Sequence, residues 1–322
     1  MSRRLAALSS LALVSLAAPA CVSETDPDPM AEAGTETGDT SGAETSETGE
    51  TGETGDGDGD VEPLEPAIAL VQYDGDIHFG DSATNIANLT EWTLEAIELG
   101  AKIIVQPEGS TYGYASDTEV WCAPGETEYF DLDCRDVSTV AEPLPGGSTT
   151  DHWAELAAEH EVYIVYHVPE VDGATYHTSL GVVGPEGFVT RYRKRDLYYI
   201  DEAFAEPGDE GVILETPYGD FGLMICLDGT YNGDNYDEYI AQGIDDIIIA
   251  MDWDDDPMGP FAAESWFADR AADNNVTIYA SDVSKWDGTA KYVPDGPRER
   301  VGLPDQAIGI DGLSVHLFES AP

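Results

Sequence analysis

The stretch 219-GDFGLMICLDGTY-231 contains a short apolar run that ends at Cys226 and gives way to polar residues. This pattern is typical of a β-strand that delivers its last side chain to the edge of a sheet, where loops begin and sites are usually built. Taken alone, Cys226 is a small buried hydrophobe, one half of a disulfide or a nucleophile. The rest of the chain has to distinguish these three interpretations.

Predicted strands and helices alternate from Ala67 onward. Residues 67–73 (AIALVQY) form a continuous apolar run that is typical of a buried strand, and residues 81–100 carry one apolar helical stripe. The alternation continues through a strand at residues 101–108 and returns in residues 151–168, 237–253 and 261–283.

Two further segments are predicted as pairs of adjacent strands. Residues 178–194 and 211–226 each contain two apolar runs that are separated by a Gly-containing tip. Two sheets with helices on their outer faces would bury the apolar sides of all these elements. We therefore predict an α/β fold for residues 66–322, arranged as a four-layer α-β-β-α sandwich in one domain.

The first 21 residues are typical of an export signal. Two arginines precede an apolar run too short to span a bilayer, and small residues then lead to Cys21. Because this ending resembles a bacterial lipoprotein box, we predict a lipoprotein that is exported and held at the membrane of a bacterial envelope or cell surface through a lipid on Cys21. Ordinary cleavage near Ala20 is the alternative.

Residues 22–65 are predicted to form a disordered acidic tether. They contain mainly Glu, Asp, Thr, Ser, Gly, Ala and Pro, as in the repeat SETGETGETGDGDGD. Such a segment buries too little apolar surface to offset the entropy lost on ordering. The run DGDGDVE superficially resembles a calcium loop but lacks the glycine at its sixth position, so no metal site is predicted.

The charge of the chain excludes some classes of partner. Lys and Arg number 13 against 65 Asp and Glu, for a formal net charge of −52. Binding to nucleic acid or to an anionic membrane surface requires clustered cations, so neither is expected. The membrane is therefore expected as a partner only through the lipid anchor.

The four cysteines can be divided by their surroundings. Cys122 and Cys134 lie 12 residues apart in an irregular segment of a chain predicted to be exported, so we expect them to form a disulfide. With Cys21 assigned to the signal region, Cys226 has no obvious partner.

Three predicted strands end in ionisable residues. Glu108 follows IIVQP, Lys194 ends FVTRYRK, and Cys226 ends FGLMIC. In an α/β layer, such residues can meet at one edge of the sheet. Each also has a simpler explanation, because a Pro-Glu after a strand is common and Lys194 lies among arginines.

Together, the motifs VQPE, RYRKRDL and MICLD resemble those of the carbon-nitrogen hydrolase, or nitrilase, superfamily. The resemblance covers about residues 66–290, and PEGSTYGY, MDW and NNVTIYASDV are most similar to its pantetheinase and biotinidase branch. It implies a Glu-Lys-Cys triad in which Cys226 is the nucleophile, Glu108 transfers protons, and Lys194 with the backbone N–H of Leu227 binds the oxyanion. We also expect the Lys194 ammonium to favour the thiolate of Cys226.

The resemblance implies several supporting residues. Glu170, in VPEVDG, matches a second carboxylate expected to hold Lys194 and to assist the hydrolytic water. Tyr112, Tyr114 and Trp253 are candidates for the substrate pocket, with simple packing as the alternative for each. Two departures from the family pattern are Asp196, where His or Asn is usual, and His177, in YHTS where Tyr-Asn-Thr is common.

The predicted function is hydrolysis of a linear, non-peptide amide of a small molecule through a cysteine acyl-enzyme, without a cofactor or a metal. One alternative is an acyltransferase that uses the same thioester. A second alternative, which the departures at Asp196 and His177 keep open, is an inactive surface-binding lipoprotein with the same fold. An acidic calcium-binding module would instead show metal-dependent stability. The sequence makes no prediction of the oligomeric state.

Overall fold

The computed structural model describes residues 67–230, 233–253, 263–286, 288–296, 298–299, 308–310 and 313–319. The predicted signal, Cys21 and the acidic tether lie outside these residues, so they remain predictions. Within the described part of the chain, no helix is both long enough and apolar enough to cross a membrane.

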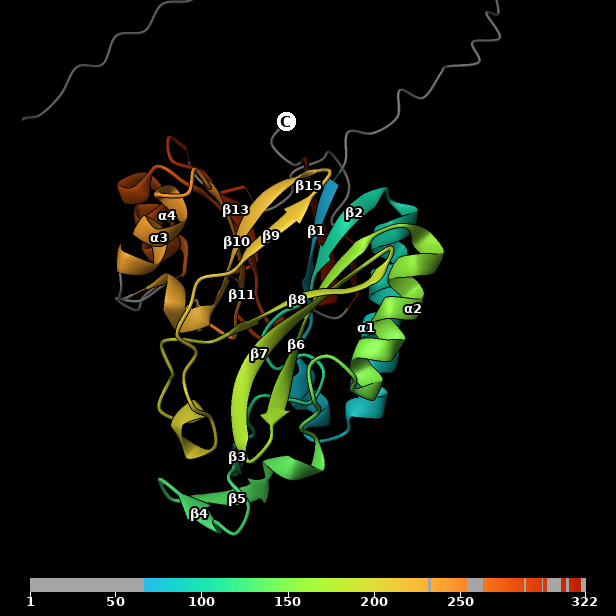
Figure 1. The fold of residues 1–322 in the computed structure, drawn as a ribbon, viewed down its shortest axis with the longest axis vertical. Coiled ribbons are helices and arrows are strands. Elements are labelled where there is room, and N and C mark those ends of the chain that lie inside the picture. Colours follow the sequence, from blue (N-terminus) through green and yellow to red (C-terminus); the bar gives the residue numbers. More distant parts are fainter. Residues whose placement is uncertain are drawn as a thin grey trace, which may run out of the picture. The chain divides into compact units, whose positions relative to one another are not determined.

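Two large sheets and four α-helices are present in the described residues of the domain. The first sheet has the strand order β14-β15-β1-β2-β6-β7-β8 and the second has the order β13-β12-β11-β10-β9. Figure 1 shows four layers: α3 and α4, the five-stranded sheet, the seven-stranded sheet, and then α1 and α2. The predicted α-β-β-α sandwich is therefore confirmed.

The seven-stranded sheet comprises β1 (Ala67–Gln72), β2 (Ala101–Val105), β6 (Tyr163–Asp172), β7 (Thr175–Gly184), β8 (Gly187–Arg193), β14 (Ile308–Ile310) and β15 (Leu313–Glu319). The five-stranded sheet comprises β9 (Ile213–Thr216), β10 (Gly219–Ile225), β11 (Asp246–Ala250), β12 (Thr277–Ser281) and β13 (Ala290–Tyr292). The outer layers are α1 (Ser82–Glu98), α2 (Ser148–His160), α3 (Gly233–Ile240) and α4 (Ala263–Asn274).

The alternation of side chains along β1 explains why both of its faces are apolar. Ile68 and Leu70 point into the core between the two sheets, whereas Ala67, Ala69 and Val71 belong to the core beneath α1 and α2. A strand between two apolar layers has no face left for polar residues. This is the physical reason for the continuous apolar run in the sequence.

The first helix follows its predicted bounds closely. At its N-terminus the Asp81 side chain accepts a hydrogen bond from the Thr84 backbone N–H at 3.2 Å, which satisfies one of the free donors of the first turn. Gly100, with φ of 97°, then turns the chain into β2. The two predicted strand pairs are also present, as β7–β8 and β9–β10.

The parallel strands position the site. Strands β1, β2 and β6 run parallel to one another, as do β10, β11 and β12. Their carboxyl ends therefore meet at one edge of each sheet.

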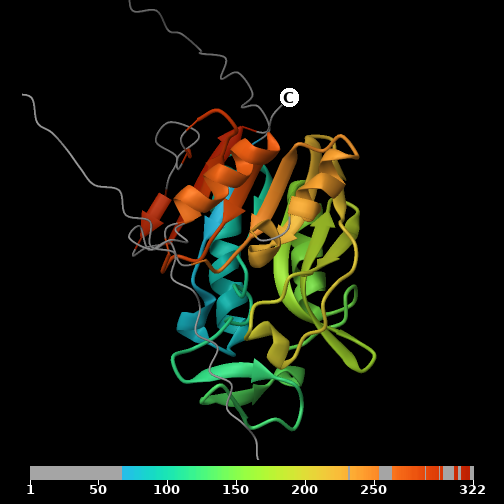
Figure 2. The ribbon, with the colours of Figure 1, turned by 90° about the vertical axis from the view of Figure 1, so that its left-hand side faces the viewer.

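A third, small sheet lies at one end of the domain (Figure 2). It contains β3 (Glu119–Cys122), β4 (Glu128–Tyr129) and β5 (Leu132–Asp136). The predicted disulfide between Cys122 and Cys134 joins β3 to β5, with 5.4 Å between the Cα atoms. A sheet this short has little core of its own, so the covalent link limits its unfolding.

Candidate active site

Glu108 and Lys194 come together at the carboxyl ends of β2 and β8. Lys194 Nζ donates a hydrogen bond to Glu108 Oε1 at 2.8 Å, and both side chains are completely buried. Eighty-six positions separate them in the chain, so the contact depends on the sheet bringing β2 and β8 to the same edge. Two of the three predicted residues therefore form a direct ion pair.

Cys226 lies at the end of β10, on a tight turn. It is 6% exposed, is not disulfide-bonded, and has φ of 45°, in the left-handed region that non-Gly residues rarely adopt. Asp228 stabilises this turn because its Oδ2 atom accepts a hydrogen bond from the Ile225 backbone N–H at 2.9 Å. Its Oδ1 atom accepts from the backbone N–H groups of Arg195 and Asp196, which ties the turn to the segment after Lys194.

The main chain of Asp252, just after β11, connects Cys226 with Glu108. Its backbone N–H donates to Glu108 Oε2 at 3.2 Å, and its carbonyl oxygen lies 3.9 Å from Cys226 Sγ. The ends of β2, β8, β10 and β11 thus place Glu108, Lys194 and Cys226 in one cluster.

Burial determines the protonation of the acid and the thiol. Desolvation raises the pKa of Glu108 to about 7; the Lys194 ammonium opposes this shift, and the Asp201 carboxylate adds to it. Burial, followed by the charge of Glu108, also raises the pKa of Cys226. Lys194 lowers the pKa of Cys226, as the sequence predicted, but these effects outweigh it, so the resting group is a thiol.

A second carboxylate contacts Lys194, and it is Asp201. Lys194 Nζ donates to Asp201 Oδ2 at 2.7 Å, and the Asp201 side chain is also completely buried. Burial lowers the pKa of Lys194, but Asp201 and Glu108 together hold it well above its usual value. Lys194 is therefore a permanent cation with two of its three N–H donors engaged.

Glu170 does not have the predicted contact with Lys194. Its carboxylate accepts hydrogen bonds from Ser179 at 2.8 Å and from Arg191 and Arg193 at 2.5 and 2.6 Å. The reason is the two-residue period of β8, which points Arg191 and Arg193 to the opposite face from Lys194. The predicted role of Glu170 in holding Lys194 is therefore wrong, and Asp201 occupies that position.

The described domain also matches a known family along most of its length. Residues 67–297 match the family model for carbon-nitrogen hydrolases. The chain belongs to the carbon-nitrogen hydrolase family.

Curated relatives of this carbon-nitrogen hydrolase include amidases and nitrilases. Omega-amidase NIT2 of Homo sapiens is 29% identical over 225 residues, which cover 66% of this chain and 73% of that protein. A nitrilase of Pyrococcus abyssi is 33% identical over 162 residues, but the match covers only 50% of this chain and 55% of the relative.

Solved structures share the fold of this carbon-nitrogen hydrolase at low identity. An amidase from Nesterenkonia sp. has a TM-score of 0.62 and 16% identity, with 81% of this chain and 92% of that chain covered. Nit3 of Saccharomyces cerevisiae, a member of branch 10 of the nitrilase superfamily, has a TM-score of 0.61 and 19% identity, with 79% and 90% covered.

The predicted pocket residues have different surroundings in this carbon-nitrogen hydrolase. The Tyr114 hydroxyl donates to Asp201 Oδ1 at 2.8 Å, and its ring centroid is 5.7 Å from Lys194 Nζ, so this residue belongs to the buried cluster. Tyr112 is 1% exposed and stacks on His167. Trp253 packs edge-on against Phe267, with 5.6 Å between ring centroids, and so contributes to packing.

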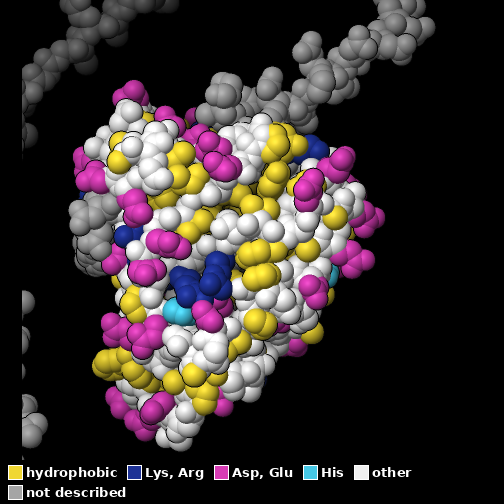
Figure 3. Space-filling model, in the orientation of Figure 1, with side chains coloured by type: hydrophobic (Ala, Val, Ile, Leu, Met, Phe, Trp, Pro, Cys, Tyr) yellow, Lys and Arg dark blue, Asp and Glu magenta, His cyan; other side chains and the backbone are white. Residues whose placement is uncertain are grey.

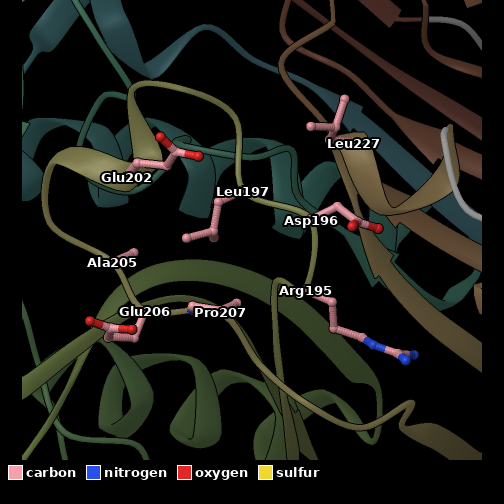
Figure 4. Close-up of a pocket in the computed structure, with 8 residues that line it drawn as sticks. All are labelled: Arg195, Asp196, Leu197, Glu202, Ala205, Glu206, Pro207 and Leu227. Carbon is pink, nitrogen blue, oxygen red and sulfur yellow. The ribbon is translucent and has the colours of Figure 1, made fainter.

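An open pocket of about 430 Å³ lies beside the turn Cys226–Gly229 (Figure 4). It is lined by Arg195, Asp196, Leu197, Glu202, Ala205, Glu206, Pro207 and Leu227. Leu227 is the second residue of the 3-10 turn Cys226–Gly229, where backbone N–H groups have no partner within the turn. The pocket therefore adjoins the backbone position predicted to bind the oxyanion.

The two departures from the family pattern have structural roles in this carbon-nitrogen hydrolase. The Asp196 Oδ2 atom accepts a hydrogen bond from Asn235 at 3.0 Å, and His177 Nδ1 lies 2.7 Å from the Glu206 carbonyl oxygen. Both contacts fix loops at the rim of the pocket.

Sequence reasoning did not identify Asp201, Asp228 or Asp252 as site residues. Asp228 lies within the MICLD motif and could have been recognised there. Asp201 lies in an irregular segment and Asp252 contributes main-chain atoms, so neither carried a periodic signal.

Proposed function

We propose that this carbon-nitrogen hydrolase cleaves linear, non-peptide amides through a thioester on Cys226. The observation that carries the proposal is the buried contact of Glu108 with Lys194, joined to Cys226 through the Asp252 main chain. A thiol, a carboxyl group with a pKa near neutrality and a permanent cation are the groups that acyl transfer needs.

In the acylation step, the Cys226 thiol gives its proton to the ionised Glu108, and the sulfur attacks the amide carbonyl carbon. The negative charge that develops on the carbonyl oxygen is stabilised by the third N–H of Lys194 and by the Leu227 backbone N–H. The tetrahedral intermediate then collapses: the C–N bond breaks, Glu108 gives its proton to the leaving nitrogen, and an amine or ammonia departs.

In deacylation, Glu108 again acts first as a base and then as an acid. Glu108 accepts a proton from water while the oxygen attacks the thioester carbonyl carbon, and collapse breaks the C–S bond. The carboxylic acid leaves, and the proton on Glu108 returns to the Cys226 sulfur. Asp201 supports both steps because it keeps Lys194 charged and aligned.

The pocket beside Leu227 favours a substrate without a net negative charge. Glu202 and Glu206 are exposed on its rim, whereas the Arg195 guanidinium is engaged with Glu238 at 2.7 Å. Acidic side chains are also widespread over the face in Figure 3, where basic ones are fewer and form their largest group near the centre. An anionic amide would therefore meet repulsion as it approached.

The similarity of the sequence to the pantetheinase and biotinidase branch suggests which amides to test. PEGSTYGY and NNVTIYASDV favour pantetheine-like or biotinyl-lysine-like amides, whereas the curated relatives include omega-amidases. We therefore propose an amidase, and the panel of amides described next identifies the acyl and amine parts of its substrate.

The test is a panel of amides supplied to the purified full chain. It should contain matched cationic, neutral and anionic amides, pantetheine-like and biotinyl-lysine-like compounds, and nitriles. We expect turnover of at least one amide, with the anionic member of each set cleaved most slowly.

Glu108→Gln should lower kcat by about 10²- to 10⁴-fold because the side-chain amide of the variant cannot carry the proton. The control Glu186→Gln, at an exposed position, should leave kcat unchanged. Absence of turnover across the panel would contradict the proposal, and transfer to an added amine in preference to water would favour an acyltransferase.

The proposed location is the membrane of a bacterial envelope, through a lipid on Cys21. Its support is the apolar run that ends at this cysteine in the sequence. The expressed protein should partition into detergent, and Cys21→Ser should release it or block its maturation. Recovery of the unmutated protein as a soluble species cleaved at another residue would contradict the anchor.

A further inference from the structure

A single lysine outside the predicted triad joins the two sheets at the edge where the site lies. Lys285 follows β12, and its Nζ atom lies 2.5 Å from Asp76 Oδ2 and 3.2 Å from Asp252 Oδ2. Asp76 belongs to the 3-10 turn Gly75–His78 after β1, in the other sheet. One ammonium group therefore connects the ends of β1, β11 and β12.

On the Asp252 side, this connection reaches two residues of the proposed triad. The Asp252 main chain contacts Glu108 Oε2 and Cys226 Sγ. Its side chain, 5% exposed, is fixed by Lys285 and by Trp286 Nε1, which donates to Asp252 Oδ1 at 2.8 Å. A shift of the Asp252 main chain would move the peptide groups beside Glu108 and Cys226, and the two side-chain contacts oppose such a shift.

On the Asp76 side, the connection reaches the third residue of the triad. The Asp76 Oδ1 atom accepts hydrogen bonds from the backbone N–H groups of Tyr114 and Ala115. The Tyr114 hydroxyl in turn binds Asp201, which holds Lys194. Both sides of the site are therefore linked to the same ammonium.

We propose that Lys285 is a positioning residue, whose ammonium, shared between Asp76 and Asp252, holds the loops that align Glu108, Cys226 and Lys194. Without it, two carboxylates would face each other across the junction between the sheets and move apart. This inference rests on the proposed amide hydrolysis for its kinetic test, but not for its chemical test.

The loss of the ammonium also has a predictable electrostatic direction. The titratable groups around Glu108 are Lys194, Asp201, Cys226 and Asp252, and the Asp252 charge raises the pKa of Glu108. The carboxylates around Lys285 are Asp74, Asp76 and Asp252, and the Lys285 charge lowers the pKa of Asp252. Removing the cation leaves this negative charge uncompensated, so Glu108 should take up its proton at higher pH.

The kinetic experiment compares Lys285→Met with Lys285→Arg and with the control Lys291→Met in the full chain. Lys291 lies in β13 and forms an ion pair with Glu299 at 3.9 Å. Lys291→Met therefore also removes one positive charge and an ion pair. We expect Lys285→Met to lower kcat by about 10- to 100-fold with little change in KM, as for a small misalignment of reacting groups. The acid limb of its pH profile should move to higher pH, and Lys285→Arg should retain most of the activity.

Two further variants separate positioning from simple destabilisation. In Lys285→Met/Asp252→Asn one of the two facing carboxylate charges is removed, so the acid limb should return toward the wild-type pH and part of kcat should recover. Asp76→Asn keeps an acceptor for the Tyr114 N–H but loses the negative charge. It should therefore lower kcat, as Lys285→Met does, with less risk to folding.

A chemical readout keeps the inference testable without turnover. Iodoacetamide alkylates Cys226, and peptide mass measures the rate of this reaction at each pH. The pH profile of the rate should shift to higher pH in Lys285→Met and stay unchanged in Lys291→Met. If the wild type cleaves no amide, the proposed function fails while this comparison still tests Lys285. Kinetic and alkylation profiles of Lys285→Met and Asp76→Asn that match those of Lys291→Met would overturn the inference.

Discussion

Lys194 donates a hydrogen bond to Asp201 Oδ2 at 2.7 Å, and both side chains are completely buried. A buried ammonium is costly unless each of its donors finds a partner. Asp201 supplies such a partner in addition to Glu108, which accepts a second hydrogen bond from Lys194 at 2.8 Å. Lys194 thus keeps its charge in a desolvated site, where a cation stabilises an oxyanion most strongly.

This relationship predicts different results for two buried carboxylates. Asp201→Asn should lower kcat, because Lys194 loses its aligned anionic partner. It should also move the acid limb of kcat/KM to lower pH, because the Asp201 charge raises the pKa of Glu108. pH–rate profiles measured with the best amide of the panel check both effects.

Glu170→Gln is the matched control. Glu170 is held by Arg191 and Arg193 on the other face of β8, so its loss should lower the free energy of unfolding by about 2 kcal/mol through weakened charged hydrogen bonds. Its kcat and acid limb should stay close to those of the wild type. Equal kinetic losses in both variants would contradict the assignment of Asp201.

The pH dependence of the wild-type enzyme follows from Glu108. This carboxyl must be ionised to accept the thiol proton, and its pKa is raised to about 7 by burial. We therefore expect kcat/KM to fall about tenfold per pH unit below pH 7 and to level off above it, until other groups titrate. An acid limb near the ordinary pKa of a glutamate, with no change near neutrality, would be inconsistent with Glu108 as a buried base.

The disulfide between Cys122 and Cys134 is predicted to support activity as well as stability. Cys122 packs in one apolar cluster with Tyr114 and Ile200, and the Ala123 N–H donates to the Ala203 carbonyl oxygen at 3.0 Å. The small sheet therefore supports the turn that carries Asp201.

Replacing both cysteines by alanine should lower the free energy of unfolding by about 2–3 kcal/mol through loss of loop closure. It should also lower kcat at temperatures where the variant remains folded. Chemical denaturation and kinetics on the same preparation separate the two effects, and an unchanged kcat would restrict the disulfide to a role in stability.

The sequence predicted the elements with clear apolar periodicity and the residues at their ends. Glu108, Lys194 and Cys226 each lie just after a strand, so the topology that brings strand ends together also brings these residues together. Glu170 was assigned incorrectly because a sequence motif does not show which face of β6 and β8 its neighbours occupy. Asp201 and Lys285 act through contacts between irregular segments, whose conformation depends on packing and not on a repeating pattern.

The proposed mechanism requires Cys226 to carry the acyl group. The most direct measurement is rapid quenching of the full chain during turnover of p-nitrophenyl acetate and of an active amide, followed by peptide mass mapping. We predict the added acyl mass on the peptide that contains Cys226, its removal by hydroxylamine, and neither adduct nor turnover in Cys226→Ala. A Cys226→Ala variant that cleaves the same amide at an undiminished rate, or an acyl group found on another residue, would contradict the account.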